Sequence, residues 1–159
     1  MGQQQLLLLV LSTVIVGLAT VAGIQAFSEN QAQASQDALV QRATATASDL
    51  KALQGKPVQL GGIDLNADSD SDGLPGSNKA TAIANRLGIE AGSQSLPSFE
   101  VAGAGSSGKC KVTVSKPKVG ITCTSADAPQ DPQVVFNPSN DTGNQVNTNL
   151  TGSFSSPSL

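Results

Sequence analysis

Histidine, tryptophan and tyrosine are absent from the 159 residues of this chain, and phenylalanine occurs only four times. Without histidine, the chain lacks the usual general base of serine and cysteine hydrolases and the commonest metal ligand. Its two cysteines are too few for a thiolate zinc site. Because the commonest catalytic groups are missing, we expect no enzymatic activity and assign no catalytic residue.

Charge and aromatic content also limit the expected partners. The formal net charge is −3 at pH 7, and this sign argues against nucleic acid as a partner. Outside the apolar N-terminal segment roughly 130 residues remain, which is enough for one small domain at most. With so few aromatic side chains that domain can bury only a thin core, so we expect partners to help bury apolar surface.

The N-terminal segment contains no charged side chain before Glu29, and residues 6–27 are mostly apolar. As a helix, residues 6–27 would extend roughly 33 Å, about the hydrocarbon thickness of a bilayer. The alternative is a secretory signal peptide that is cleaved near Ala22. Such peptides begin with positively charged residues and have apolar regions of about 7–15 residues. The sequence therefore favours a retained hydrophobic helix that is long enough to span a membrane.

Small residues recur at helical spacing inside this segment. Ala19 and Gly23 are four positions apart, as are Ala22 and Ala26, and Gly17 precedes them. Small residues let helix backbones approach closely, so that dispersion and weak Cα–H···O contacts join the helices. Glycine and alanine are also common in membrane helices generally, which leaves a second interpretation open. The spacing nevertheless indicates association between helices.

The helical pattern continues beyond the apolar segment, because residues 25–54 contain neither proline nor glycine. Apolar residues in this stretch recur near the 3.6-residue helical period and form one face: Ala32, Leu39, Ala43, Ala47, Leu50 and Leu53. Gly55 is typical of a helix C-terminal cap, and Pro57 prevents continuation. We therefore predict one helix from Gln3 to Gln54, roughly 75–80 Å long.

The chain thus has an early glycine, an uncharged apolar helix that runs into an amphipathic one, and a small domain rich in Gly, Ser and Thr. This layout resembles that of type IV pilins and the related pseudopilins. A peptidase cuts members of that family after a glycine, so the resemblance implies that residues 1–2 are a short leader. The cut would follow Gly2, and the mature chain would begin at Gln3. Its fifth residue would be Leu7, where the family usually has a glutamate that pairs with a neighbour's free amine.

The resemblance also implies a fold and a location. In type IV pilins the apolar half of the helix anchors the subunit in the inner (cytoplasmic) membrane before assembly. It then packs into the core of an extracellular filament, a homo-polymer that membrane-bound pilus assembly machinery builds on the cell surface. The expected fold class is α+β, with the long N-terminal helix packed on a small head domain that contains an antiparallel β-sheet.

Composition divides the chain after the helix. Residues 55–78 are expected to form an acidic, glycine-rich loop, and residues 79–138 a small head with a short helix and an antiparallel sheet. Residues 139–159 form a polar tail with little to bury. This tail is expected either to be disordered in the monomer or to be ordered against a neighbouring subunit.

Three further segments of the head show periodic patterns. The stretch SNKATAIANRLGI predicts a short helix that Ser77 or Asn78 caps, that lies against the sheet, and that Gly88 ends. The stretch SFEV alternates with period two and predicts a strand. The stretch DPQVVFNP predicts another strand, and its flanking prolines suit a sheet edge.

The stretch GKCKVTVSKPKVGITCTSA predicts a β-hairpin that turns at Lys116–Pro117. Folding it there sets Val114 opposite Val119, Val112 opposite Ile121, and Cys110 opposite Cys123. Directly opposed residues have Cβ atoms near enough for a disulfide. A bond between Cys110 and Cys123 would indicate an oxidising compartment. Two reduced thiols in the core are the alternative.

The acidic loop contains the pattern D-x-D-x-D-G, which begins many calcium-binding loops. The candidate ligands, which all carry side-chain oxygens, are Asp64, Asn66, Asp68, Asp70 and Asp72. Lys79 stands where an EF-hand would have a bidentate glutamate. Calcium is therefore the one candidate cofactor, and a solvated acidic turn that keeps the head soluble is the alternative.

Asn140 and Asn149 match the acceptor pattern for N-glycosylation. Many tails rich in Asn and Thr would match it as well, so both are candidate sites only.

These patterns and the resemblance favour a structural subunit of a type IV pilus-like filament, which polymerises through its hydrophobic N-terminal helix. One alternative is a single-pass, membrane-anchored surface domain that binds calcium or a partner and acts alone. Another is a pseudopilin of a secretion system, which shares the architecture and forms short assemblies.

Overall fold

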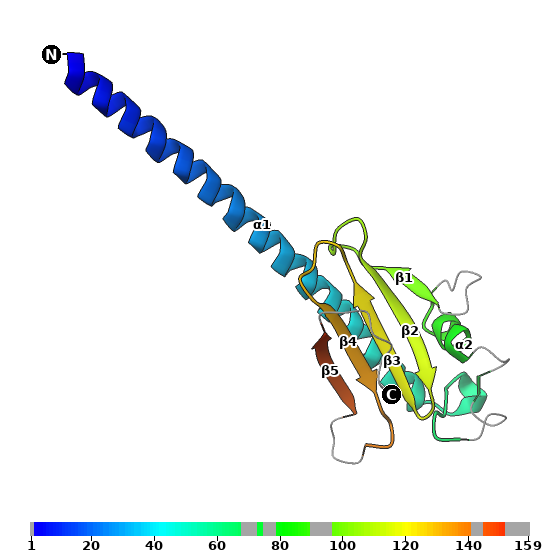
Figure 1. The fold of residues 1–159 in the computed structure, drawn as a ribbon. Helices are drawn as coiled ribbons and strands as arrows, with labels where there is room; N and C mark the ends of the chain where they lie inside the picture. Colours follow the sequence, from blue (N-terminus) through cyan, green and yellow to red (C-terminus); the bar gives the residue numbers. More distant parts are fainter. Residues whose placement is uncertain (1, 68–72, 75–78, 90–96, 141–144, 152–159) are drawn as a thin grey trace.

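The computed structural model of the chain describes residues 2–67, 73–74, 79–89, 97–140 and 145–151 (Figure 1). It confirms the α+β fold, with one long helix packed on a five-stranded antiparallel sheet. The helices are α1 (Gly2–Gln54), the 3₁₀ turn η1 (Val58–Leu60) and α2 (Lys79–Arg86). The strands are β1 (Ser98–Glu100), β2 (Lys109–Ser115), β3 (Lys118–Thr124), β4 (Asp131–Phe136) and β5 (Val146–Thr151).

Helix α1 is unbroken from Gly2 to Gln54, which confirms the predicted helix to within one residue. Its C-terminal half lies across one face of the sheet, while its N-terminal half projects away from the head (Figure 1). The predicted apolar stripe faces the sheet, because Leu39, Ala43, Ala47 and Leu50 are fully buried. Contact between one stripe of the helix and the sheet therefore explains why apolar residues recur at the helical period in this half.

The end of α1 differs in one detail from the expectation. The backbone N–H of Gly55 donates to the carbonyl of Lys51 at 3.1 Å. Gly55 does not have a positive φ, so it is not the left-handed cap that its position suggested. The helix still ends at Gln54, and Pro57 follows at the N-terminus of η1.

The five strands follow one another in sequence order, each antiparallel to the next. Helix α1 packs mainly on β4 and β3, and α2 lies beside β2 (Figure 1). Gly88 follows α2 with a positive φ, which confirms the predicted end of this helix, and Ala80 and Ile83 of α2 are buried. Ser77 and Asn78, the predicted caps, lie outside the described residues.

The β2–β3 hairpin has the register that the sequence predicted. Val114 pairs with Val119, Val112 with Ile121, and Cys110 with Cys123. The two cysteines form a disulfide, so the alternative of reduced thiols is wrong. Both cysteines are fully buried and pack in the cluster that contains Leu39 and Ala43 of α1. The disulfide therefore lies in the core between helix and sheet.

Two expectations about the C-terminal part of the head are wrong. Strand β4 is not an edge strand, because it pairs with β3 on one side and with β5 on the other. Its Pro132 lies within the strand, opposite Leu150. The head also does not end at residue 138, since β5 lies within the expected polar tail. Val146 packs against both core clusters, which gives this polar strand an apolar anchor.

A second core cluster lies around the C-terminal end of α1. It contains Leu50 of α1, Ile83 of α2 and Phe136 of β4, together with buried residues of the connecting loop. Arg86 fixes that loop, because its guanidinium donates to the carbonyls of Gly61, Gly62 and Gly73. Both helices, the sheet and the loop thus contribute to this second cluster, which joins the head to the C-terminal half of α1.

Candidate functional site

The largest candidate surface is the N-terminal half of α1. Residues 2–31 are exposed, and the large apolar side chains from Leu6 to Phe27 are 50–72% exposed. Among the described residues, α1 is the one helix that is long and apolar enough to cross a membrane. An apolar surface of this extent marks a site that contacts lipid or other protein chains.

Three hydroxyl groups between Leu6 and Phe27 are satisfied within the helix itself. The hydroxyls of Ser12 and Thr13 donate to the carbonyls of Leu9 and Val10 at 2.9 and 2.8 Å. The hydroxyl of Thr20 donates to the carbonyl of Val16 at 2.8 Å. Because these side chains need no water, they do not oppose transfer of the helix into an apolar environment.

Four of the five predicted packing residues share one face of α1. At about 100° per residue, Ala19, Ala22, Gly23 and Ala26 lie within one quarter to one third of the helix circumference. Gly17 lies roughly on the opposite side, so the structure does not bring it together with the other four. The four-residue face is turned roughly 140° from the stripe that packs on the sheet. We call Ala19, Ala22, Gly23 and Ala26 the small-residue face.

The predicted processing site lies at the tip of this surface. Gly2 and Gln3 are the first residues of α1 and are exposed, and residue 1 lies outside the described part of the chain. A peptidase would therefore act at the helix start, and cleavage after Gly2 stays a prediction.

The predicted calcium ligands fall into two groups. Asp68, Asp70 and Asp72 lie outside the described residues, so the calcium site stays a prediction. The carboxylate of Asp64 accepts hydrogen bonds from the Gln54 side chain at 3.3 Å and from the Asn66 backbone at 3.0 Å. The side-chain oxygen of Asn66 accepts from the Ser139 hydroxyl at 2.6 Å. Both residues thus connect the loop to other elements of the head.

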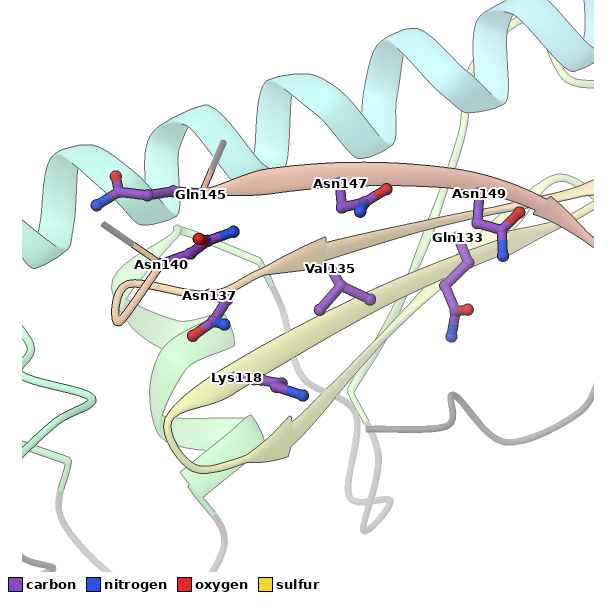
Figure 2. A pocket seen from close by; sticks show the side chains of 8 residues that line it. All are labelled: Lys118, Gln133, Val135, Asn137, Asn140, Gln145, Asn147 and Asn149. Carbon is purple, nitrogen blue, oxygen red and sulfur yellow. The ribbon is translucent and has the colours of Figure 1, made fainter. Parts of the chain in front are cut away.

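A groove crosses the outer face of the sheet, on the side away from α1 (Figure 2). Its volume is about 270 Å³. Eight described residues line it, and six of them carry side-chain amides: Lys118, Gln133, Val135, Asn137, Asn140, Gln145, Asn147 and Asn149. We call this feature the amide groove. It combines side chains of β3, β4 and β5 with those of the loop between β4 and β5.

Both candidate glycosylation sites line the amide groove. Asn149 lies on β5 and is exposed, and Asn140 lies in the β4–β5 loop and is half-buried. Both asparagines thus lie on the outer face of the head. Glycosylation of either residue stays a prediction.

Two electrostatic features of the described part of the head are a raised pKa and a cation–π contact. Burial raises the pKa of the Asp131 carboxyl, at the start of β4, above its ordinary value of 3.8. Arg42 of α1 lies over the ring of Phe99 on β1, 5.2 Å from its centroid, and this cation–π contact joins helix and sheet. Among the described residues, no group of three or more acidic or cysteine side chains could hold a metal ion. The apolar half of α1 and the amide groove are two surfaces of the described residues with functional potential.

Reasoning from the sequence did not find the amide groove. Its asparagines on β5 alternate with Val146, Thr148 and Leu150, which is a strand signal that could have been read. The groove itself depends on the neighbouring strand, where Gln133 lies opposite Asn149 and Val135 opposite Asn147. Such pairing between distant segments has no local signal.

The long apolar helix and the small antiparallel sheet have the layout that the resemblance to type IV pilins implies. The similarity to known proteins is limited to this layout. No protein-family model, no curated protein and no solved structure matches the chain.

Proposed function

We propose that this chain is a structural subunit of an extracellular filament of the type IV pilus kind, and that it polymerises through the N-terminal half of α1. The observation that carries the proposal is the contrast within one unbroken helix. Residues 2–31 are exposed on every side, whereas the following residues bury one stripe against the sheet. A helix that is apolar all round requires lipid or other apolar helices around it.

The rigid junction between the two halves supports a filament over a simple tether. Residues 24–54 contain neither glycine nor proline, so no flexible linker separates the apolar half from the head. Each head is therefore held at a fixed angle to its apolar helix. A regular helical polymer depends on such a fixed angle, whereas a domain that acts alone gains nothing from it.

The small-residue face supports contact between neighbouring helices. Because it is turned away from the stripe that packs on the sheet, a second helix can approach it without meeting the head of the same chain. A Cβ added at Gly23 would have no heavy atom within 4 Å, so this surface is uncovered in the single chain. Close approach at small residues is how helices associate in an apolar environment.

The same helix accounts for a membrane stage before assembly. Residues 6–27 match the roughly 30 Å hydrocarbon thickness of a bilayer, and membrane-bound assembly machinery would take the subunit from there to the cell surface. Leu7 carries no charge that could pair with a neighbour's amine. Register between subunits in this filament would therefore come from helix packing and from contacts between heads.

Electron microscopy of material sheared from cells that produce the chain tests this proposal. We expect filaments whose polypeptide, by intact mass, retains residues 6–27. The same mass shows whether residues 1–2 are removed. Protein that stays in the membrane fraction without a helical repeat would contradict the proposal and favour a single-pass surface domain. Short assemblies confined to the cell envelope would indicate a pseudopilin, and a cut near Ala22 would indicate a signal peptide.

A further inference from the structure

We propose that the amide groove binds the sugar units of a glycan. This inference does not depend on the filament, because all eight lining residues belong to one head. Figure 2 shows their side chains gathered on one face of the sheet, over β3, β4 and β5.

The chemistry of the lining fits hydroxyl-rich ligands. Each asparagine or glutamine side chain carries both donors and an acceptor, and a sugar hydroxyl can donate and accept at the same time. Gln133, Asn147 and Asn149 lie on adjacent strands, so the pairing of β4 with β5 fixes the backbone positions from which their amides extend.

Within the described part of the chain, two buried polar atoms on this face have no hydrogen-bond partner. They are Nε2 of Gln133 and the hydroxyl oxygen of Thr122. Thr122 is only 7% exposed, and it lies directly opposite Gln133 in the β3–β4 ladder. An unsatisfied buried polar group costs about 1–3 kcal/mol and calls for an explanation in a native structure. Gln133 lines the groove whereas Thr122 does not, so a hydroxyl of a bound ligand would supply the partner that Nε2 of Gln133 lacks.

Other classes of ligand fit the groove less well. Lys118 is the one charged residue among the described lining residues, so the groove does not have the cluster of cations that a phosphate or an acidic peptide needs. Val135 is the one apolar residue there, so an apolar peptide side chain would find little surface. The volume of about 270 Å³ is just below the roughly 300–1,000 Å³ of small-molecule pockets. It suits one or two sugar rings.

The test uses the full chain in a zwitterionic detergent, because a detergent with a sugar headgroup would compete for the groove. Saturation-transfer NMR would be recorded with cellobiose, lactose, N,N′-diacetylchitobiose and one glucuronic-acid disaccharide. We expect at least one of the four to bind with a Kd on the order of 1 mM. Binding of none at roughly tenfold higher concentration would overturn the proposal.

Matched variants locate the binding. Asn147→Leu removes an exposed amide of the groove, and Asn85→Leu removes an exposed amide of α2, outside the groove. We expect roughly tenfold weaker binding for Asn147→Leu and unchanged binding for Asn85→Leu. Equal affinities for both variants would place binding elsewhere and overturn the proposal. Lys118→Gln should weaken only the glucuronic-acid ligand, and equal weakening of the neutral sugars would contradict the role of Lys118 as a charge partner.

The intact mass of the protein from its native cells supplies an independent check. Binding of an external glycan requires that Asn140 and Asn149 carry no attached sugar, so this proposal and glycosylation at the two acceptor patterns exclude each other. A glycan covalently bound to either residue would occupy the groove and overturn the proposal of an external ligand. Neither measurement depends on filament assembly, so the sugar-binding proposal and the filament proposal can each be contradicted without affecting the other.

Discussion

The two halves of α1 are both helical, but the N-terminal half is exposed and the C-terminal half is partly buried against the sheet. From Leu6 to Phe27 the helix exposes large apolar side chains in every direction, whereas from Leu39 to Leu50 it exposes polar residues and buries one apolar stripe. The difference shows how the distribution of apolar residues around a helix determines what must cover it. A single apolar stripe can be covered by one sheet, whereas a helix that is apolar on all sides must be surrounded by lipid or by several helices.

The largest expected effect comes from a charge in the apolar half. Ala22→Arg places a guanidinium on the small-residue face within the apolar segment, where insertion of a charge costs up to about 2.5–3.5 kcal/mol. We expect electron microscopy to find no filaments from this variant. Ser48→Arg, an exposed position in the C-terminal half, should leave filaments intact. Normal filament yield from Ala22→Arg would show that the apolar half is not the polymer core.

A pair of leucine substitutions compares the two halves directly. Leu50 is fully buried in the head, and Leu9 is 64% exposed on the apolar half. Leu50→Ala should lower the free energy of unfolding of the head by about 2–5 kcal/mol, because it leaves a cavity. Leu9→Ala should leave it unchanged, as measured by calorimetry of the detergent-solubilised chain. Similar losses for both variants would mean that the head contacts the apolar half.

The disulfide stabilises only the C-terminal half and the head. Joining Cys110 to Cys123, 13 residues apart, should contribute about 3 kcal/mol by restricting the unfolded chain. The double variant Cys110→Ala with Cys123→Ala should lose this amount in calorimetry. Reduction of the wild-type protein supplies the control, and it should give a comparable loss. A change below about 1 kcal/mol would show that core packing alone holds the hairpin.

Gly23 on the small-residue face and Gly17 on roughly the opposite side of α1 form a matched pair of glycines. An added Cβ at Gly23 or at Gly17 has no heavy atom within 4 Å in the single chain, so leucine fits at both positions before assembly. Overpacking a helix contact costs about 1–3 kcal/mol. We expect Gly23→Leu to reduce the amount of filament severalfold and Gly17→Leu to reduce it less. Comparable membrane levels of the two variants are the control, and the reverse order would show that the other face makes the closer contact.

The smallest expected effect concerns pH. The pKa of Asp131 is higher in the folded head than its ordinary value of 3.8 because of burial. The folded state therefore holds this proton more tightly than the unfolded state, and the free energy of unfolding falls as pH rises from the unfolded to the folded pKa. Asp131→Asn should remove this dependence in calorimetry across that pH window. An unchanged pH profile would show that Asp131 does not cause it.

Features with a local signal could be predicted from the sequence. The length of α1 follows from its period and from the absence of glycine and proline, and Pro57 marks its end. The β2–β3 register follows from alternation around one turn, and this register places Cys110 opposite Cys123. In each of these cases the interacting residues are neighbours in sequence, so patterns with periods of two and 3.6 were sufficient.

Features that depend on distant segments could not be predicted in this way. Pro132 gave a local signal for an edge, but Val134 and Phe136 needed to be buried at the centre of the sheet, and β5 completed it. The cation–π contact of Arg42 with Phe99 joins the long helix to the far edge strand. The amide groove likewise exists only because β3, β4 and β5 are neighbours.

The most direct test of the account is a cryo-electron microscopy reconstruction of the sheared filaments that shows what surrounds residues 6–27. We predict that residues 6–27 of neighbouring copies lie in van der Waals contact at the filament centre, with Ala22 and Gly23 at helix crossings and the heads outside. A filament whose centre lacks these helices would contradict the account, and so would residues 6–27 found only in lipid.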